Sequence, residues 1–108
     1  MNAAATVNDL AVPVRGLLAV CAEFGDLPAF YVGISSLYPK RLDLSLHDGL
    51  GSFELWRAAL DIEAHDVRFA VQSAGTTWVL EGSTTYAGAE LRLIAYGDAP
   101  QPLPVGEG

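Results

Sequence analysis

Two short clusters hold the residues of this chain that could carry out acid–base or metal chemistry. They are His47-Asp48 and a second group made of Glu63, His65 and Asp66. A helix expected between the clusters would place them about 18 Å apart at a rise of ~1.5 Å per residue, whereas zinc ligands lie within about 2 Å of the ion. The clusters therefore cannot share a metal, and the second one alone is an incomplete ligand set. We expect no metal and no other cofactor.

Nucleophilic chemistry has equally little support in the sequence. A Ser/His/Asp triad could be assembled from Ser35, His47 and Asp43. Residues of these types are so common that the match is uninformative without geometry. Cys21 falls near the carboxyl end of an expected helix, with no basic neighbour to activate it. The chain has no phosphate-binding glycine loop and no dinucleotide fingerprint. We expect a protein that is not an enzyme; a small-ligand site or an active site near His47 and His65 is the third hypothesis.

The segment from Asp66 to Tyr96 predicts three antiparallel strands, because apolar and polar residues alternate along it with a period of two. Two-residue loops at Ala74-Gly75 and Ala87-Gly88 would join them. This register opposes Val71 to Trp78, Phe69 to Leu80, Arg68 to Glu81, Thr84 to Leu91, Gly82 to Leu93 and Leu80 to Ala95. It places six apolar residues on the buried face: Phe69, Val71, Trp78, Leu80, Leu91 and Leu93.

The Ala-Gly loops leave an alternative register open. Two-residue hairpin loops prefer Asn-Gly, Asp-Gly or a leading glycine, whereas Ala-Gly better suits a type I turn followed by a glycine bulge. A three-residue loop would shift the pairing by one and oppose Phe69 to Val79. The two-residue loop places more apolar residues opposite one another than the three-residue loop does, so we expect the two-residue register.

A helix is expected from Pro13 to Phe24, with proline at its first position and Gly25 as the stop. Its apolar stripe would consist of Val14, Leu17, Leu18, Cys21 and Phe24. A hairpin should follow, with a five-residue loop from Ser36 to Lys40. It would oppose Ile34 to Leu42, Val32 to Leu44 and Phe30 to Leu46.

Asp48 is expected to cap a second helix, whose core residues are Leu50, Phe53, Trp56 and Leu60. The predicted order is α-β-β-α-β-β-β, an α+β fold with a five-stranded, mainly antiparallel sheet and two helices packed on one face. Residues 1–12 would form an N-terminal arm, 13–97 a single domain and 98–108 a flexible tail rich in proline and glycine. The order of the strands in the sheet stays open.

The charge balance limits the classes of partner. Thirteen acidic and six basic residues give a formal net charge of −7, which argues against a general nucleic-acid or anionic-membrane binder. The same charge suits a basic protein partner or simply promotes solubility. A single cysteine, no signal-peptide pattern and no apolar run of membrane-spanning length predict a cytoplasmic protein.

The face of the sheet away from the helices is the expected interaction surface. The candidate interface consists of four residues of this face and two of the first hairpin loop: Tyr31, Val79, Ile94, Tyr96, Leu37 and Tyr38. Three arginines on the same face should be cancelled by three acids, as in ordinary cross-strand pairing. They are Arg41, Arg68 and Arg92 with Asp43, Glu81 and Glu90. An apolar strip on an uncovered face is typical of an interface.

We therefore expect a non-enzymatic protein-interaction module, a homodimer formed through the open sheet face or an edge strand. The alternative is an acidic inhibitor, either immunity-like or a DNA mimic of a phage or mobile element, that binds a basic protein. Direct nucleic-acid or membrane binding is not expected.

Three segments, LPAFYVGISSLYPKRLDLSLH, FELWRAAL and TTWVLEGSTTYAGAELRLIAYGDAP, resemble small hypothetical proteins of actinobacterial chromosomes, phages and integrative elements. The resemblance covers about residues 13 to 99. It implies a bacterial or phage cytoplasmic context, and it assigns no functional residue.

Overall fold

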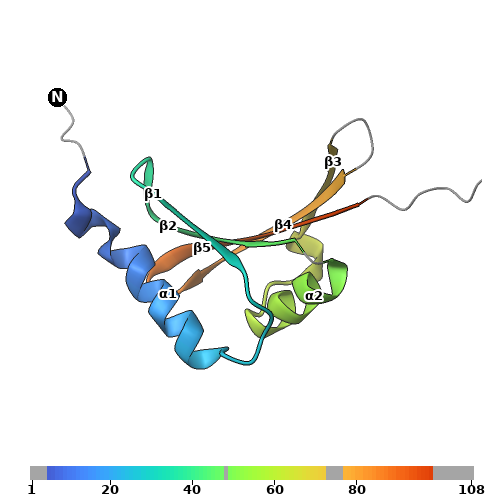
Figure 1. Ribbon diagram of the computed structural model, residues 1–108, viewed down its shortest axis with the longest axis horizontal. Coiled ribbons are helices and arrows are strands. Elements are labelled where there is room, and N and C mark those ends of the chain that lie inside the picture. Colours follow the sequence, from blue (N-terminus) through green and yellow to red (C-terminus); the bar gives the residue numbers. More distant parts are fainter. Residues whose placement is uncertain (1–4, 48, 73–76, 99–108) are drawn as a thin grey trace, which may run out of the picture.

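A computed structural model describes residues 5–47, 49–72 and 77–98 of the chain. It shows an α+β fold in which two helices lie on one side of a five-stranded sheet (Figure 1), as the sequence predicts. The elements are η1 (Val7–Leu10), α1 (Ala11–Glu23), β1 (Tyr31–Ser35), β2 (Tyr38–Leu46), α2 (Leu50–Ala59), η2 (Ala64–Asp66), β3 (Arg68–Gln72), β4 (Thr77–Tyr86) and β5 (Ala89–Asp98).

The strand order is β1-β2-β5-β4-β3, so the last strand lies in the middle of the sheet. β2 and β5 are parallel, and the other neighbours are antiparallel. A parallel pair needs a long crossover, and here it consists of α2, β3 and β4. The two central strands bring together the most deeply buried apolar rows, which are Leu42, Leu44 and Leu46 of β2 and Leu91, Leu93 and Ala95 of β5.

The predicted register of the three-stranded meander is confirmed at every pair named above. Tyr86 pairs with Ala89, so the loop between β4 and β5 has two residues. Ala87 has a φ of 50° and Gly88 a φ of 83°, which is the left-handed pair of a type I′ turn. The bulged three-residue alternative is therefore wrong for this turn. The loop at Ala74-Gly75 lies outside the described residues.

The first hairpin differs from the prediction at its loop. Val32 pairs with Leu44 as expected, but the register shifts between Gly33 and Ser35, and Ser35 pairs with Tyr38. The loop therefore has two residues, not five, and Ile34 lies in the irregularity and not opposite Leu42. The Ser35 hydroxyl oxygen accepts a hydrogen bond from the Leu37 N–H at 3.1 Å, which holds the tight loop.

Helix α1 begins at Ala11, two residues before Pro13. The backbone N–H of Thr6 donates to the Asp9 carboxylate at 2.8 Å and supports η1, which runs directly into α1. Pro13 then stands in the first turn of α1, where a missing N–H removes no helical hydrogen bond.

The buried side of α1 is rotated from the predicted stripe. It consists of Pro13, Gly16 and Val20. Of the predicted stripe, Leu17 and Phe24 pack against the core, whereas Val14, Leu18 and Cys21 are exposed. A Cβ on Gly16 would lie 3.1 Å from the Cβ of Ala89. The helix therefore approaches the sheet closely through its smallest residue, and this close approach fixes the rotation.

Helix α2 supplies the other half of the core: Phe53, Trp56 and Leu60 are buried as predicted. The prediction is wrong for Leu50, which is 53% exposed in the first turn of the helix. Gly49, with a φ of 112°, precedes it. The proposed cap, Asp48, lies outside the described residues. Within the described ranges, no helix is long and apolar enough to cross a membrane.

One part of the predicted core is wrong. Phe69 and Val71 share the helix side of the sheet with Trp78 and Leu80, but their exposed fractions are 64% and 52%. They belong to β3, the edge strand farthest from α1 (Figure 1), whereas the core contacts of the helices are with the central strands. The helical layer ends before it covers this edge.

Candidate interaction surfaces of the sheet

The open face is the side of the sheet opposite the helices, and a group of three rings occupies one part of it. The His47 ring stacks on Tyr96 with centroids 5.0 Å apart and meets Tyr31 edge-on at 4.9 Å. Tyr31 comes from β1 and Tyr96 from β5, while His47 follows directly after β2 between them. The structure thus joins two of the candidate interface residues through a histidine that the sequence offered as a catalytic candidate.

The apolar strip of the open face is mostly covered by its own neighbours. Ile94 is only 6% exposed, and Val79 and Tyr96, which pair across β4 and β5, are partly buried. Tyr31 is the member of the strip that reaches solvent, with an exposed fraction of 69%. The strip therefore offers a partner less apolar area than its composition indicates.

Leu37 and Tyr38, the other two candidate interface residues, lie at the β1–β2 loop. Both are exposed. The Arg41 guanidinium carbon lies 4.0 Å from the centre of the Tyr38 ring, a cation–π contact. The loop is at the far end of β1 from Tyr31, so these two residues do not join the strip.

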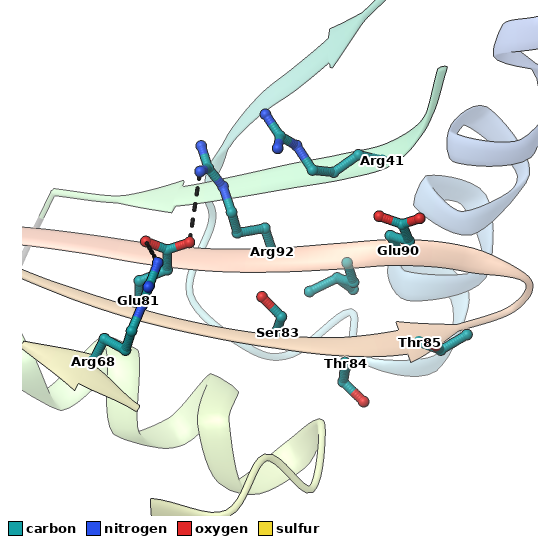
Figure 2. A pocket seen from close by; sticks show the side chains of 9 residues that line it. Arg41, Arg68, Glu81, Ser83, Thr84, Thr85, Glu90 and Arg92 are labelled. Carbon is teal, nitrogen blue, oxygen red and sulfur yellow. Dashed lines mark hydrogen bonds and ion pairs between the residues drawn. The ribbon is translucent and has the colours of Figure 1, made fainter. Parts of the chain in front are cut away.

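Beside the rings, the open face carries the predicted arginines in a network of ion pairs, part of which Figure 2 shows. Arg92 is central: its Nε donates to Asp43 Oδ1 at 3.2 Å, and its Nη1 lies 3.6 Å from Glu81 Oε2. Arg68 Nη2 lies 3.5 Å from the other Glu81 oxygen. Arg41 Nε is 3.0 Å from Asp43 Oδ1 but is not aligned to donate a hydrogen bond.

This network borders a shallow hollow of about 510 Å³, which Ser83, Thr85 and Glu90 also line. Because two carboxylates bridge the three guanidinium groups and Glu90 adds a third negative charge, the hollow has no excess of positive charge. The expected cancellation of charge is confirmed for Asp43 and Glu81. Partly exposed pairs of this kind contribute at most about 1 kcal/mol each to stability.

The edge of the sheet at β3 is a second surface. All five residues of β3 are exposed. On one side β3 pairs with β4, and no strand in the described part of the chain pairs with its other side. Phe69 and Val71 therefore stand beside a row of backbone groups that are open to a further strand.

An apolar groove adjoins this edge on the helix side. It has a volume of about 360 Å³ and lies between α2 and the start of the meander, with a lining of Leu50, Phe53, Glu54, Arg57, Ala64, Val67 and Leu80. Leu80, which lines the groove, pairs with Phe69, so Phe69 lies next to the groove on the same side of the sheet. Glu54 and Arg57 form a two-point ion pair at its rim, at 2.7 and 2.5 Å. Hydrogen bonding with Arg57 lowers the pKa of the Glu54 carboxyl.

The sequence offered an edge strand as a possible interface but did not identify it as β3, because the alternation that identifies β3 also predicts a buried side for it. Its apolar residues have the same period as those of β4 and β5. The one available signal is length, since β3 has five residues and β4 has ten.

The structure describes all the residues proposed for acid–base chemistry or metal binding except Asp48. His65 is exposed in η2, and its Nε2 lies 3.6 Å from the Asp66 carboxylate. Across residues 5–47, 49–72 and 77–98, no group of three or more histidine, cysteine or acidic side chains could hold a metal ion.

Comparison with known proteins adds no assignment. No protein-family model matches the chain, and a search of curated proteins gives no match.

Proposed function

We propose that this protein is a non-enzymatic interaction module that forms a homodimer through the β3 edge. The observation that carries the proposal is the exposure of the whole β3 strand, with Phe69 and Val71 in solvent beside open backbone groups. An edge with unpaired N–H and C=O groups is a template for another strand.

The composition of β3 supports this use of the edge. Natural edge strands are commonly protected by lysine, proline, a bulge or a covering element. β3 has the sequence RFAVQ, pairs with β4 without a register shift, and carries one charge, on Arg68. Arg68 is on the open face, so it does not shield Phe69 and Val71 on the helix side.

The open face supports dimerisation less well than the edge does. Its most apolar member, Ile94, is already buried, and the ion pairs around Arg92 would lose water if a partner covered them. Removing ion pairs from water costs free energy that their attraction does not always offset. On its helix side the β3 strand presents only Phe69 and Val71, which carry no charge.

The test is sedimentation of the purified protein over a range of micromolar concentrations. We expect a monomer–dimer equilibrium in the natural chain. Phe69→Lys should raise the dissociation constant about tenfold or more, because the interface would bury a lysine in place of an aromatic anchor. Val71→Lys should act in the same direction.

The matched control is Leu37→Lys. Leu37 is even more exposed than Phe69, at 81%, but lies in the β1–β2 loop. It should leave the dissociation constant unchanged. Tyr31→Lys probes the open face: if it abolishes the dimer while Phe69→Lys does not, the interface is the open face. A natural chain that remains a monomer at all concentrations would remove the proposal.

The acidic-inhibitor alternative has less support from the arrangement of charges. A DNA mimic presents carboxylates in an unpaired array, whereas Asp43 and Glu81 of the open face are paired with arginines. For the compartment, we propose a reducing cytoplasm. The support is the single cysteine, which the structure places at an exposed position of α1 as a free thiol.

A further inference from the structure

We infer that two copies of the chain pair β3 with β3 in antiparallel orientation about a twofold axis at Ala70, which would make one continuous ten-stranded sheet from two five-stranded ones. This inference rests on the self-association proposed above. It adds the identity of the occupant, a second copy of the same strand, and the residues that face each other.

The side chains of β3 alternate between the two sides of the sheet. Residues directly opposite each other in a sheet point to the same side. In β3, Phe69 and Val71 point to the helix side, while Arg68, Ala70 and Gln72 point to the open face. In a self-paired β3, odd-numbered residues must therefore face odd-numbered residues of the partner, and even-numbered residues must face even-numbered ones. A twofold axis perpendicular to the sheet meets this condition when it passes through a residue.

Ala70, the middle residue of β3, is the best position for this axis. An axis at Ala70 opposes Ala70 to itself, Phe69 to the partner's Val71 and Arg68 to the partner's Gln72. It is the register that pairs all five residues of β3. An axis at Arg68 would oppose two arginines, which is unfavourable for like charges. An axis at Phe69 would leave Gln72 outside the paired strand.

The charge distribution also favours contact at β3. Each copy carries a net charge of −7, so two copies repel each other over most approaches. β3 contains no acidic residue, and its one charge, on Arg68, is directed to the Glu81 carboxylate of the same chain. The edge is therefore a place where two acidic chains can meet without opposing carboxylates.

Pairing of the two β3 strands would also cover apolar surface. Each Phe69 would lie against the partner's Val71 on one side, and on the other it pairs with Leu80, which lines the groove between α2 and the meander. Cross-strand pairs of an aromatic and a β-branched residue are among the favourable ones in sheets. The two exposed residues that the helices leave uncovered would thus cover each other.

The register is tested with single-cysteine variants. Cys21 is exposed and is first replaced in Cys21→Ser, which becomes the background for all other variants. The pairing places the two Ala70 Cβ atoms about 4.5–5.5 Å apart. The Cβ atoms of a disulfide lie about 3.5–4.5 Å apart, so a small shift would allow the bond. Ala70→Cys should therefore form a disulfide-linked dimer under mild oxidation, read as a doubled mass on non-reducing gels.

Arg68→Cys and Gln72→Cys are the matched controls on the same face. Four residues separate each position from its own copy along the strand direction, or about 13 Å, so neither variant should cross-link by itself. A mixture of the two should cross-link, because Arg68 faces the partner's Gln72. This pattern distinguishes a defined register from random collision.

The outcomes separate the register from the proposed function. If sedimentation shows a dimer that Phe69→Lys abolishes, but Phe69→Cys cross-links and Ala70→Cys does not, the edge is used and the axis is misplaced. If Arg68→Cys and Gln72→Cys each cross-link as fast as Ala70→Cys, no fixed register exists. A background chain that stays monomeric contradicts both. Circular dichroism of each variant verifies that the fold is kept.

Discussion

At the scale of single residues, Trp56 connects the two helices and the loop between α1 and β1. Its ring is almost fully buried, and its indole N–H donates to the Pro28 carbonyl at 2.8 Å. Phe24 and Phe30 meet the ring edge-on, with centroids 5.7 and 5.4 Å away. Edge-to-face pairs of this kind add to the free energy gained by burial. Trp56 thus holds the helical layer together.

We predict that Trp56→Phe lowers the free energy of unfolding by about 2 kcal/mol, because it leaves the Pro28 carbonyl without its donor and opens a small cavity. Urea unfolding measures the change. The control is Leu55→Ala on the exposed side of the same helix, expected to change stability by less than about 0.5 kcal/mol. Equal effects of the two substitutions would contradict this role of Trp56.

A second residue, Tyr86 of β4, ties the sheet to α1. Its hydroxyl donates to the Glu23 carboxylate and lies 3.3 Å from the Ala19 carbonyl oxygen. The hydrogen bond to Glu23, together with burial and the charge of Glu23, raises the pKa of Tyr86 to about 12. The fold therefore favours the protonated phenol.

This raised pKa predicts a loss of stability in base. The unfolded tyrosine has a pKa near 10.0, so the contribution of the phenol is complete below that pH and falls as the pH rises toward about 12. We expect the stability difference between the natural chain and Tyr86→Phe to be constant below pH 10 and to shrink above it. Denaturant unfolding across this range measures the difference. A difference that grows in base would contradict the assignment.

At the scale of the elements, the β4–β5 turn is the connection that fixes the register of the sheet centre. Its two residues are both left-handed, and the first of them, Ala87, has a side chain that this conformation disfavours by about 1–2 kcal/mol. The turn keeps its geometry because the two strands that it joins are in register at ten residue pairs. The long ladder outweighs the unfavourable loop residue.

We therefore predict that Ala87→Asn stabilises the protein by about 0.5–1 kcal/mol, since asparagine tolerates the left-handed region and Asn-Gly is the preferred type I′ pair. Ala87→Val should destabilise it, because a β-branched side chain is worse than alanine at positive φ. Thermal unfolding of both variants gives the test. A stabilising valine would show that the loop is not a type I′ turn in solution.

At the scale of the whole molecule, an acidic chain has to associate against its own charge. Two copies with a net charge of −7 repel each other, and added salt screens this repulsion: the Debye length falls from about 30 Å at 0.01 M to about 10 Å at 0.1 M. We predict that the homodimer becomes tighter over this range of salt, as measured by sedimentation. An acidic inhibitor bound to a basic partner would show the opposite dependence. A homodimer weakened by salt would indicate an interface held by ion pairs instead of by Phe69 and Val71.

The sequence by itself determined the α+β class and the complete register of β3, β4 and β5. Both follow from local information: alternation assigns each strand a face, and short loops force neighbouring strands to pair. The same information placed Trp56 in the core and Arg68, Arg92 and Glu81 together on the open face.

The tertiary structure decided which segments cover which. The pairing of β2 with β5 depends on competition for burial between strands far apart in the sequence, and periodicity carries no information on that competition. The close contact of Gly16 with Ala89 set the rotation of α1. Two short helices cannot cover five strands, so Phe69 and Val71 remain exposed although their alternation is typical of core residues. The candidate interface at β3 exists because the helices leave this edge uncovered.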